Sequence, residues 1–221
     1  MPVPRRLLSD FEENTFFHVI CKSIEKRKLF QTDFDKLFFL QRYVDFITGF
    51  ADTYAYNLLT NHVHLLIHVK SISEIVENLS HYNPKELTRT QSKFLNGNKD
   101  ELLHELIEQQ FNRLCISYAR TYNIKKNESG HLFLRPFKRV AVENDFHLTQ
   151  LMVYIHANSI KHGISADFTN DKWSSYRSIL SSFPTFIERD KVLNWFGNRE
   201  NFIKTHKEQI GYYYENQYSI E

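Results

Sequence analysis

Apolar residues follow two different periods along this chain, and each period predicts one type of secondary structure. Runs rich in β-branched and aromatic residues predict strands at residues 15–22, in the two halves of residues 52–70, and at residues 137–143. The polar pair Thr60 and Asn61 interrupts the second run and is expected to form the turn between its two strands. The pattern therefore predicts four strands.

Apolar residues at intervals of three and four predict amphipathic helices, which are expected at residues 32–50, 71–83, 100–122, 145–162 and 189–208. The first helix begins at a cap formed by Thr32 and Asp35, and the fourth stops before Gly163. The stretch between the second and third helices contains Pro84 and Gly97, so we expect a loop or a short insertion there.

The order strand, helix, two strands, helices, strand, helix is typical of α+β proteins. We expect a ferredoxin-like (RRM-like) antiparallel sheet with helices on one face, followed by a C-terminal helical elaboration. The 221 residues, 42% of them hydrophobic, can build one substantial core but not several independent domains. We assign residues 1–180 to one domain, with an insertion or diverged segment at about 73–100, and residues 181–221 to a C-terminal helical extension.

Composition limits the function only in part. The chain has 28 Lys and Arg against 26 Asp and Glu, so nucleic-acid binding would depend on local basic patches rather than on the overall charge of +2. Cys21 and Cys115 fit no Cys-x-x-Cys spacing and are interpreted as reduced thiols. The N-terminus lacks the apolar core of a signal peptide, and no stretch is long enough to span a bilayer, so a cytoplasmic location is expected.

His62 and His64 are the first residues that indicate chemistry. Only one residue separates them, so on a strand both imidazoles project from one face and can bind the same metal ion, while Val63 and Leu65 face the core. Alone, the pair is a weak signal, because 11 histidines in this chain give a chance His-x-His about half the time. His68 lies about 13 Å further along the same strand and is interpreted as a structural or surface histidine.

Tyr154 and Asn158 form a second candidate pair. They lie four residues apart on a predicted helix, so the phenol and the amide should project side by side as nucleophile and metal ligand. The alternative is a core tyrosine and a surface amide, which is the commoner role for any one of the 12 tyrosines. Tyr176 is the other candidate nucleophile, but its Trp-Ser-Ser-Tyr context indicates packing.

Cationic residues follow or flank these elements and predict contacts with DNA phosphates. They are Lys125, Lys126, Arg135, Lys138, Arg139, Lys161 and His162. The aromatic residues Tyr122, Phe133 and Phe137 lie nearby in the sequence and could stack on unpaired bases. A solvated charged face accounts for these cations equally well.

Several of these segments, taken in order, resemble the HUH single-tyrosine transposases, especially the REP-associated tyrosine transposase branch with its insertion-sequence-200-like domain. The matching motifs are Phe17-His18-Val19, Glu25-Lys26-Arg27, Asn61-His62-Val63-His64-Leu65-Leu66, Gly130-His131-Leu132-Phe133, Arg135-Pro136-Phe137-Lys138, Tyr154-Ile155-His156-Ala157-Asn158, Lys161-His162-Gly163 and Trp173-Ser174-Ser175-Tyr176. Together they extend over about residues 15 to 177, and the combination is far more specific than the histidine pair.

The resemblance implies a ferredoxin-like core, a divalent metal (Mg²⁺ or Mn²⁺) and a tyrosine that attacks single-stranded DNA to form a covalent 5′-phosphotyrosine. His62 and His64 match the metal-binding histidines, Tyr154 matches the nucleophile, and Asn158 matches the polar residue that completes the metal site. The implied substrate bears a short imperfect hairpin. A homodimer is compatible with this reading, because in related enzymes the tyrosine acts on the histidine pair of its own subunit or of a partner.

The sequence departs from the family in two places. Ser159 follows Asn158 where the family usually has proline, so the end of this helix is expected to differ in shape. The stretch at about residues 73–100 matches poorly, so DNA recognition there stays unassigned.

Two other interpretations remain, and a third is excluded by the length of the chain. The chain could be a catalytically inactive nucleic-acid-binding relative, or a HUH replication initiator or relaxase with the same chemistry. A zinc hydrolase would also place His-x-His on a strand, but it needs a β/α barrel for which this chain is too short.

Overall fold

Four strands form one antiparallel sheet in the computed structural model, which describes residues 3–142 and 144–215. They are β1 (Phe16–Lys22), β2 (Ala51–Leu58), β3 (His62–Val69) and β4 (Lys138–Ala141). Their order across the sheet is β2-β3-β1-β4, which is the ferredoxin-like arrangement, so the predicted α+β fold class is confirmed. Glu143, the last residue of the predicted fourth strand, lies outside the described residues.

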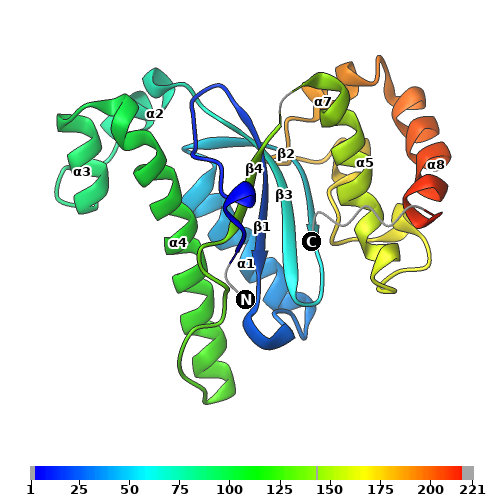
Figure 1. Cartoon of the computed structure of the whole chain (residues 1–221), viewed down its shortest axis with the longest axis horizontal. Coiled ribbons are helices and arrows are strands. Elements are labelled where there is room, and N and C mark those ends of the chain that lie inside the picture. Colours follow the sequence, from blue (N-terminus) through cyan, green and yellow to red (C-terminus); the bar gives the residue numbers. More distant parts are fainter. Residues whose placement is uncertain (1–2, 143, 216–221) are drawn as a thin grey trace.

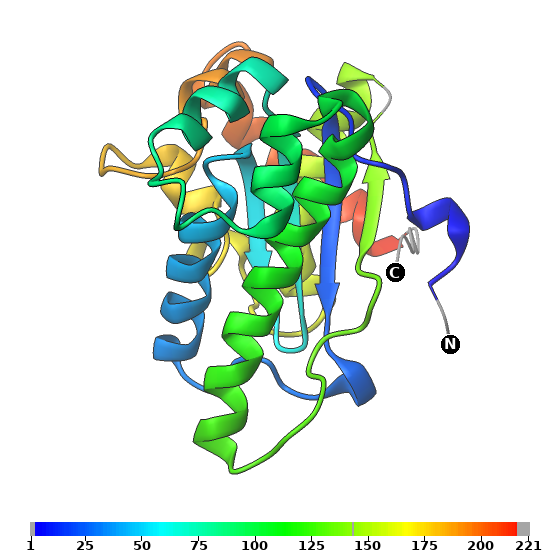
Figure 2. The same cartoon turned by 90° about the vertical axis from the view of Figure 1, so that its left-hand side faces the viewer.

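Helices cover both faces of this sheet. The described helices are α1 (Asp33–Ile47), α2 (Ile72–Ser80), α3 (Arg89–Asn96), α4 (Lys99–Lys126), α5 (Asp145–Lys161), α6 (Tyr176–Leu180), α7 (Arg189–Trp195) and α8 (Arg199–Glu215), with short 3-10 turns at Arg5–Leu7, Ile24–Lys26 and Phe168–Asn170. The ferredoxin-like helices α1 and α4 lie on one face, as expected (Figure 2). The later helix α5 lies on the other face, with α8 packed against its outer side, so the expectation that helices cover only one face is corrected (Figure 1).

The strand register determines which side chains meet α5. Ile20 of β1 pairs with His64 of β3, and Lys22 pairs with His62. Because neighbours in register share a face, these residues project toward α5, whereas the alternate residues project toward α1 and α4. Cys21 belongs to that second set, and it is a free, buried cysteine like Cys115 of α4.

An irregularity in β2 changes which of its residues face α5. The register with β3 shifts between Thr53 and Ala55. Before the shift, the Thr53 hydroxyl bonds to the hydroxyl of Tyr43 on α1 at 2.7 Å. After it, Asn57 lies opposite His64 and contacts α5. Residues four apart in a regular strand share a face, so the bulge is what turns Asn57 toward α5.

Two predicted boundaries were wrong. The stretch containing Pro84 and Gly97 is not only loop, because it includes α3, whose capping box joins Thr88 to Gln91 and whose Phe94 is fully buried. The predicted helix at residues 189–208 is two helices, α7 and α8, which are separated at Gly197, where φ is +83°.

The C-terminal part of the chain packs directly on the sheet and on α5. The backbone N–H of Leu58 donates to the Trp173 carbonyl, and the N–H of Ser175 donates to the Tyr56 carbonyl, each at 3.0 Å, so this segment extends the hydrogen bonding of β2. Within the described part of the chain, no helix combines the length and apolar character needed to cross a membrane.

Candidate active site

The predicted histidine pair lies on the face of β3 that α5 covers. The ring centroids of His62 and His64 are 4.9 Å apart, and the rings are inclined at 68°. Both side chains are buried, with 2% and 0% of their surface exposed. Val63 and Leu65 project from the opposite face into the core, as the alternation of the strand requires. The two imidazoles therefore converge on one region, as predicted.

Helix α5 brings Tyr154 to this pair. The Tyr154 ring centroid is 5.8 Å from that of His64, with the rings nearly perpendicular, and 6.2 Å from that of His18. Only 4% of the Tyr154 surface is exposed. Two segments far apart in the sequence thus place a phenol against the candidate metal-binding histidines.

Asn158 lies one turn after Tyr154, and only one of the two polar atoms of its amide forms a hydrogen bond with the described residues. Its Nδ2 donates to the carbonyl oxygen of Tyr154 at 2.9 Å, which fixes the orientation of the amide. Its Oδ1 is buried and accepts no hydrogen bond from the described residues. A buried acceptor without a donor costs about 1–3 kcal/mol, and an amide oxygen in this state has lone pairs available for a cation.

A hydrogen bond fixes the tautomer of His62. Its Nδ1 lies 2.7 Å from Oδ1 of Asn61, and because an amide oxygen only accepts, Nδ1 carries the proton. In a neutral ring the lone pair is then on Nε2, which is the form that binds a metal. Asn61 is therefore a supporting residue that the sequence motif contains but does not explain.

His18 of β1 plays the same part for His64. Its Nε2 lies 2.9 Å from Nδ1 of His64, and both rings are buried. Burial, together with the nearby charge of Lys138, lowers the pKa of His18 to about 3, so the His18 ring is neutral. In the tautomer in which the neutral His18 ring accepts at Nε2, Nδ1 of His64 donates and the His64 lone pair is on its own Nε2. The motif Phe17-His18-Val19 contains His18 but does not reveal its role, although a histidine within an apolar strand indicates a buried partner.

Asn57 connects α5 to the sheet at the level of His64. Its Nδ2 donates to the carbonyl oxygen of Ile155 at 2.8 Å, and its own surface is fully buried. A carbonyl inside a helix accepts one bond within the helix and has a second lone pair. The Asn57 amide uses that lone pair, so it holds α5 against β2 while the hydrogen bonding of the helix stays intact. This contact could not be predicted, because the bulge that orients Asn57 leaves no clear pattern in the sequence.

A chain of buried hydrogen bonds holds the other side of α5. Nδ1 of His206 donates to the Phe202 carbonyl at 2.8 Å, so its Nε2 accepts from Nδ1 of His156 at 2.8 Å. Nε2 of His156 then accepts from the hydroxyl of Ser175 at 2.7 Å, and that oxygen also accepts from the N–H of Tyr56 at 2.9 Å. This order resembles a nucleophile, base and orienting group. Its hydrogen bonds are mutually satisfied and join α5 to α8 and to β2, so the chain positions α5.

Three of the predicted cations lie beside the site. Nζ of Lys161 is 5.3 Å from the centroid of the Tyr154 ring. The ring of His162 is 4.9 Å from that of His62 and is exposed on its outer side. Lys138 pairs with Ile20 in the sheet and so projects from the same face as the histidines.

The other predicted cations lie elsewhere. Lys125 and Lys126 are at the end of α4, where they bond to Asp35 and Gln31 near the start of α1. Arg139 faces α4, is 5% exposed, and forms an ion pair with Glu108 at 3.1 Å and a hydrogen bond to the Ser9 carbonyl at 2.9 Å. Sequence reasoning placed Arg139 among the cations that contact DNA phosphates, and this expectation is corrected. A buried guanidinium with these partners stabilises the fold instead. Arg135 is exposed on the loop before β4.

The two rival residues are both packed among aromatic rings. The ring centroid of His68 is 4.5 Å from that of Phe16, which in turn contacts Trp195, so His68 belongs to a cluster separate from the histidine pair. Tyr176 is buried against Phe168 at 4.9 Å and has no contact with the histidine pair among the described residues.

The helix after Asn158 continues through Ser159 to Lys161, and Gly163 with φ of +65° follows it.

The donor set fits a divalent cation with open coordination positions. His62 and His64 would supply imidazole nitrogens, and Asn158 would supply an amide oxygen, which is the ligand type that Mg²⁺ and Mn²⁺ prefer. In residues 3–142 and 144–215, no group of three or more His, Cys, Asp or Glu side chains could hold a metal. A set of two imidazoles and one amide leaves room for phosphate oxygens and water.

Comparisons with known proteins give limited similarity. No protein-family model matches the sequence, and no curated protein matches it at a significant level. Among solved structures, the REP-associated tyrosine transposase bound to a REP hairpin has a TM-score of 0.45 at 13% identity, covering 80% of this chain and 89% of that chain. Two bacterial tRNA(His) guanylyltransferase-like structures, with GTP and with ATP, have TM-scores of 0.34 and 0.31 at 12% and 10% identity, covering 76% and 89% of this chain and 74% and 73% of theirs. All three TM-scores are below 0.5, so only the site residues themselves indicate a function.

Proposed function

We propose that this chain is a metal-dependent transposase or endonuclease that cuts and rejoins single-stranded DNA through Tyr154. One observation carries the proposal: His64 contacts Tyr154 and His62 contacts His162, so the buried histidine pair lies along the face of α5 on which Asn158 stands between those two residues. The motif order in the sequence supplies the reaction class, because a protein that only bound DNA would not need the histidine pair, Tyr154 and Asn158 together.

In this proposal His62, His64 and Asn158 hold Mg²⁺ or Mn²⁺. A bound divalent cation would neutralise the charge of the scissile phosphate and orient it for attack. Asn61 and His18 would keep the two imidazoles in the tautomer that binds metal, with His18 accepting from Nδ1 of His64.

Tyr154 would act as the nucleophile in two related steps. Its phenolate oxygen attacks the phosphorus, a new P–O bond to Tyr154 forms, and the P–O bond to the 3′ oxygen breaks. The 3′ oxygen takes a proton and leaves as a hydroxyl, while the 5′ phosphate stays on the tyrosine. A 3′ hydroxyl can later attack the phosphotyrosine in reverse, so strand joining needs no ATP.

Cations near the nucleophile support an anionic substrate. Lys161, 5.3 Å from the Tyr154 ring centroid, would stabilise negative charge that develops on the phenol oxygen. Lys138 and His162 border the same face and would contact phosphates on either side of the cut. The proposed substrate is single-stranded DNA with a short hairpin.

Burial of the site sets a condition on substrate access. Tyr154, His62 and His64 expose 4% of their surface or less, so a DNA strand reaches them only after the packing around α5 opens locally. Asn57 holds the middle of α5 on the sheet, and we therefore expect the opening to start at an end of the helix rather than at its centre.

The nucleophile is tested by incubating the protein and Mn²⁺ with a panel of labelled hairpin oligonucleotides and detecting covalent adducts on denaturing gels. Tyr154→Phe should abolish the adduct while DNA affinity stays the same. Tyr176→Phe is the matched control, since it removes a hydroxyl from another buried tyrosine, and it should retain the adduct. An adduct that persists in Tyr154→Phe would overturn the assignment.

The metal-binding residues are tested in the same assay. His62→Ala and His64→Ala should each lose Mn²⁺-dependent adduct formation by at least about a hundredfold. His68→Ala, on the same strand and the same face, is the control and should remain active. Oligonucleotide binding without any adduct in the unmodified protein, with every hairpin tried, would instead identify a non-catalytic DNA-binding relative.

A further inference from the structure

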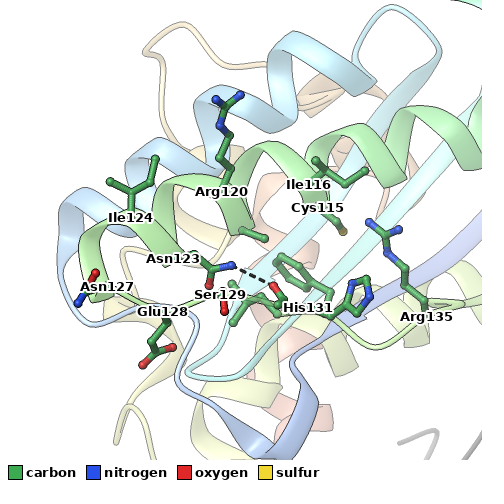
Figure 3. A pocket seen from close by; sticks show the side chains of 14 residues that line it. Cys115, Ile116, Arg120, Asn123, Ile124, Asn127, Glu128, Ser129, His131 and Arg135 are labelled. Atoms are coloured by element: carbon green, nitrogen blue, oxygen red, sulfur yellow. Dashed lines mark hydrogen bonds between the residues drawn. The ribbon is translucent and has the colours of Figure 1, made fainter.

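A cavity outside the candidate active site lies between the C-terminal half of α4 and the loop that precedes β4 (Figure 3). Its volume is about 790 Å³, within the range of roughly 300–1,000 Å³ that small-ligand sites have. One wall is formed by α4 residues from Cys115 to Ile124, and the other by residues from Asn127, just after α4, to Arg135. None of the proposed catalytic residues lines it.

Cations stand on both walls of this cavity. Arg120 extends from α4 and Arg135 from the loop, with His131 beside Arg135 (Figure 3). Among the described residues, neither arginine forms a salt bridge, and both are exposed. Glu128, the acidic residue of the lining, is paired with Arg27. The cavity therefore presents positive charge that the surrounding protein leaves uncompensated, and this favours an anionic ligand.

Apolar surface lies between these cations. Ile116 and Ile124 line the α4 wall with 53% and 74% of their surfaces exposed. Leu132 and Phe133 form part of the opposite wall and are almost fully buried. A planar base can lie against apolar side chains while guanidinium groups contact its phosphate, so this combination fits a nucleotide of an unpaired strand.

The cavity lies at the same end of the sheet as His62. The N–H of Leu134 donates to the carbonyl of Lys22 at 2.8 Å, and Ser23 forms a β-bridge with Phe133. Lys22 pairs with His62. The cavity wall at Phe133 is therefore two strands away from His62, which is about 10 Å in the plane of the sheet. It lies on the opposite face of the sheet, so a strand leaving the site would reach it around this end of the sheet.

We propose that this cavity binds a nucleotide of the single strand that continues from the cleavage site, with Arg120 and Arg135 on its phosphates and Ile124 against a base. The inference rests on the proposed function for the identity of the strand. It extends that function, because it assigns a second contact region on the far face of the sheet and includes Arg120 and His131, which the sequence motifs did not single out as DNA contacts.

The test measures binding without chemistry. Full-length Tyr154→Phe protein, in EDTA, is titrated with a fluorescent single-stranded oligothymidylate over a series of salt concentrations. Adding Arg120→Gln and Arg135→Gln should weaken binding by about tenfold and reduce the slope of log K against log salt by about 1.4, since each lost single-strand contact contributes about 0.7. Lys85→Gln with Arg89→Gln removes the same charge from exposed residues elsewhere and should change neither quantity.

The outcomes separate the two proposals. Because neither metal nor nucleophile takes part, weakened binding in the arginine variant would support the cavity even if the Tyr154 adduct never forms. Equal affinity and equal salt slope in the arginine and control variants would overturn it. Ile124→Glu, at an exposed position, is a second variant and should also weaken oligothymidylate binding. If that variant instead leaves DNA affinity unchanged and turns a dimer into a monomer, the cavity is a surface between copies of the chain and the proposal is wrong.

Discussion

Nε2 of His18 lies 2.9 Å from Nδ1 of His64, and this contact joins β1 to a candidate metal-binding histidine on β3. The two residues are not opposite one another in the sheet, because His18 pairs with Leu66 and His64 pairs with Ile20. Their rings therefore meet diagonally across the strand pair, a distance that long side chains can bridge. The contact fixes the ring that would bind metal, so it gives His18 a testable role.

Replacing His18 should weaken metal binding while the fold remains. In His18→Leu, Nδ1 of His64 loses its acceptor, and we expect Mn²⁺ affinity to fall by about 10- to 100-fold, the usual effect of removing such an outer partner. Calorimetric titration with Mn²⁺ measures this, and His18→Gln, which retains an acceptor, should recover most of the affinity. His68→Leu is the control on the same sheet face. Unchanged Mn²⁺ affinity in His18→Leu would show that the contact is only structural.

Asn158 should separate metal binding from stability. Asn158→Leu removes the buried Oδ1 that accepts no bond from the described residues, which is a gain, and the bond from Nδ2 to the Tyr154 carbonyl, which is a loss. Because the two effects oppose one another, the free energy of unfolding of the metal-free protein should change by less than about 1 kcal/mol. The increase in melting temperature that Mn²⁺ produces should disappear, because binding of a ligand to the folded state is what raises it. Asn158→Asp should bind Mn²⁺ more tightly. A Mn²⁺-induced shift that survives in Asn158→Leu would exclude Asn158 as a ligand.

The fold could be predicted well in segments whose apolar residues follow a single regular period. β1 and α1 were expected at nearly their observed bounds, because their apolar patterns are regular and the capping box of Thr32 and Asp35 marks a start. α3 was missed, since its burial of Phe94 depends on α4 rather than on local periodicity. The break at Gly197 was missed for a similar reason, because glycine is tolerated within a helix and only tertiary packing fixes its positive φ.

The site could be predicted in its central residues but not in its supports. The His-x-His alternation and the four-residue spacing of Tyr154 and Asn158 follow from local geometry. That β3 and α5 face one another depends on the complete topology, and only the family resemblance suggested it. The anchor at Asn57 depends on a bulge, and the burial of Arg139 depends on which face of β4 meets α4, and neither is visible in the sequence.

The buried chain through His206 should make stability fall in acid. Burial lowers the pKa of His206 to about 4, against about 6.5 in the unfolded chain. Between these values the unfolded state binds a proton that the folded state does not, so stability is present above about pH 6.5 and is lost as the pH falls toward 4. His206 contributes about 1.4 kcal/mol per pH unit in this window.

Urea unfolding followed by tryptophan fluorescence at several pH values measures this contribution. His206→Gln keeps an acceptor for His156 but does not titrate, so its stability should fall less steeply with acid by about one proton. Trp173 and Trp195 report the unfolding. Parallel pH profiles for the two proteins would mean that His206 is not the group that takes up the proton.

Arg139 and Lys161 should respond in opposite ways to loss of charge. Arg139 is buried with Glu108 and the Ser9 carbonyl, so Arg139→Met leaves a half-buried carboxylate without its partner and should cost about 3–5 kcal/mol of stability. Lys161 is exposed, so Lys161→Met should change stability by less than about 1 kcal/mol. The same variant removes the positive charge near the Tyr154 ring and should slow adduct formation by about tenfold or more. Thermal melts and adduct rates on one hairpin oligonucleotide separate these effects. If Arg139→Met is as stable as the unmodified protein but binds DNA more weakly, Arg139 contacts DNA and its assignment to stability is wrong.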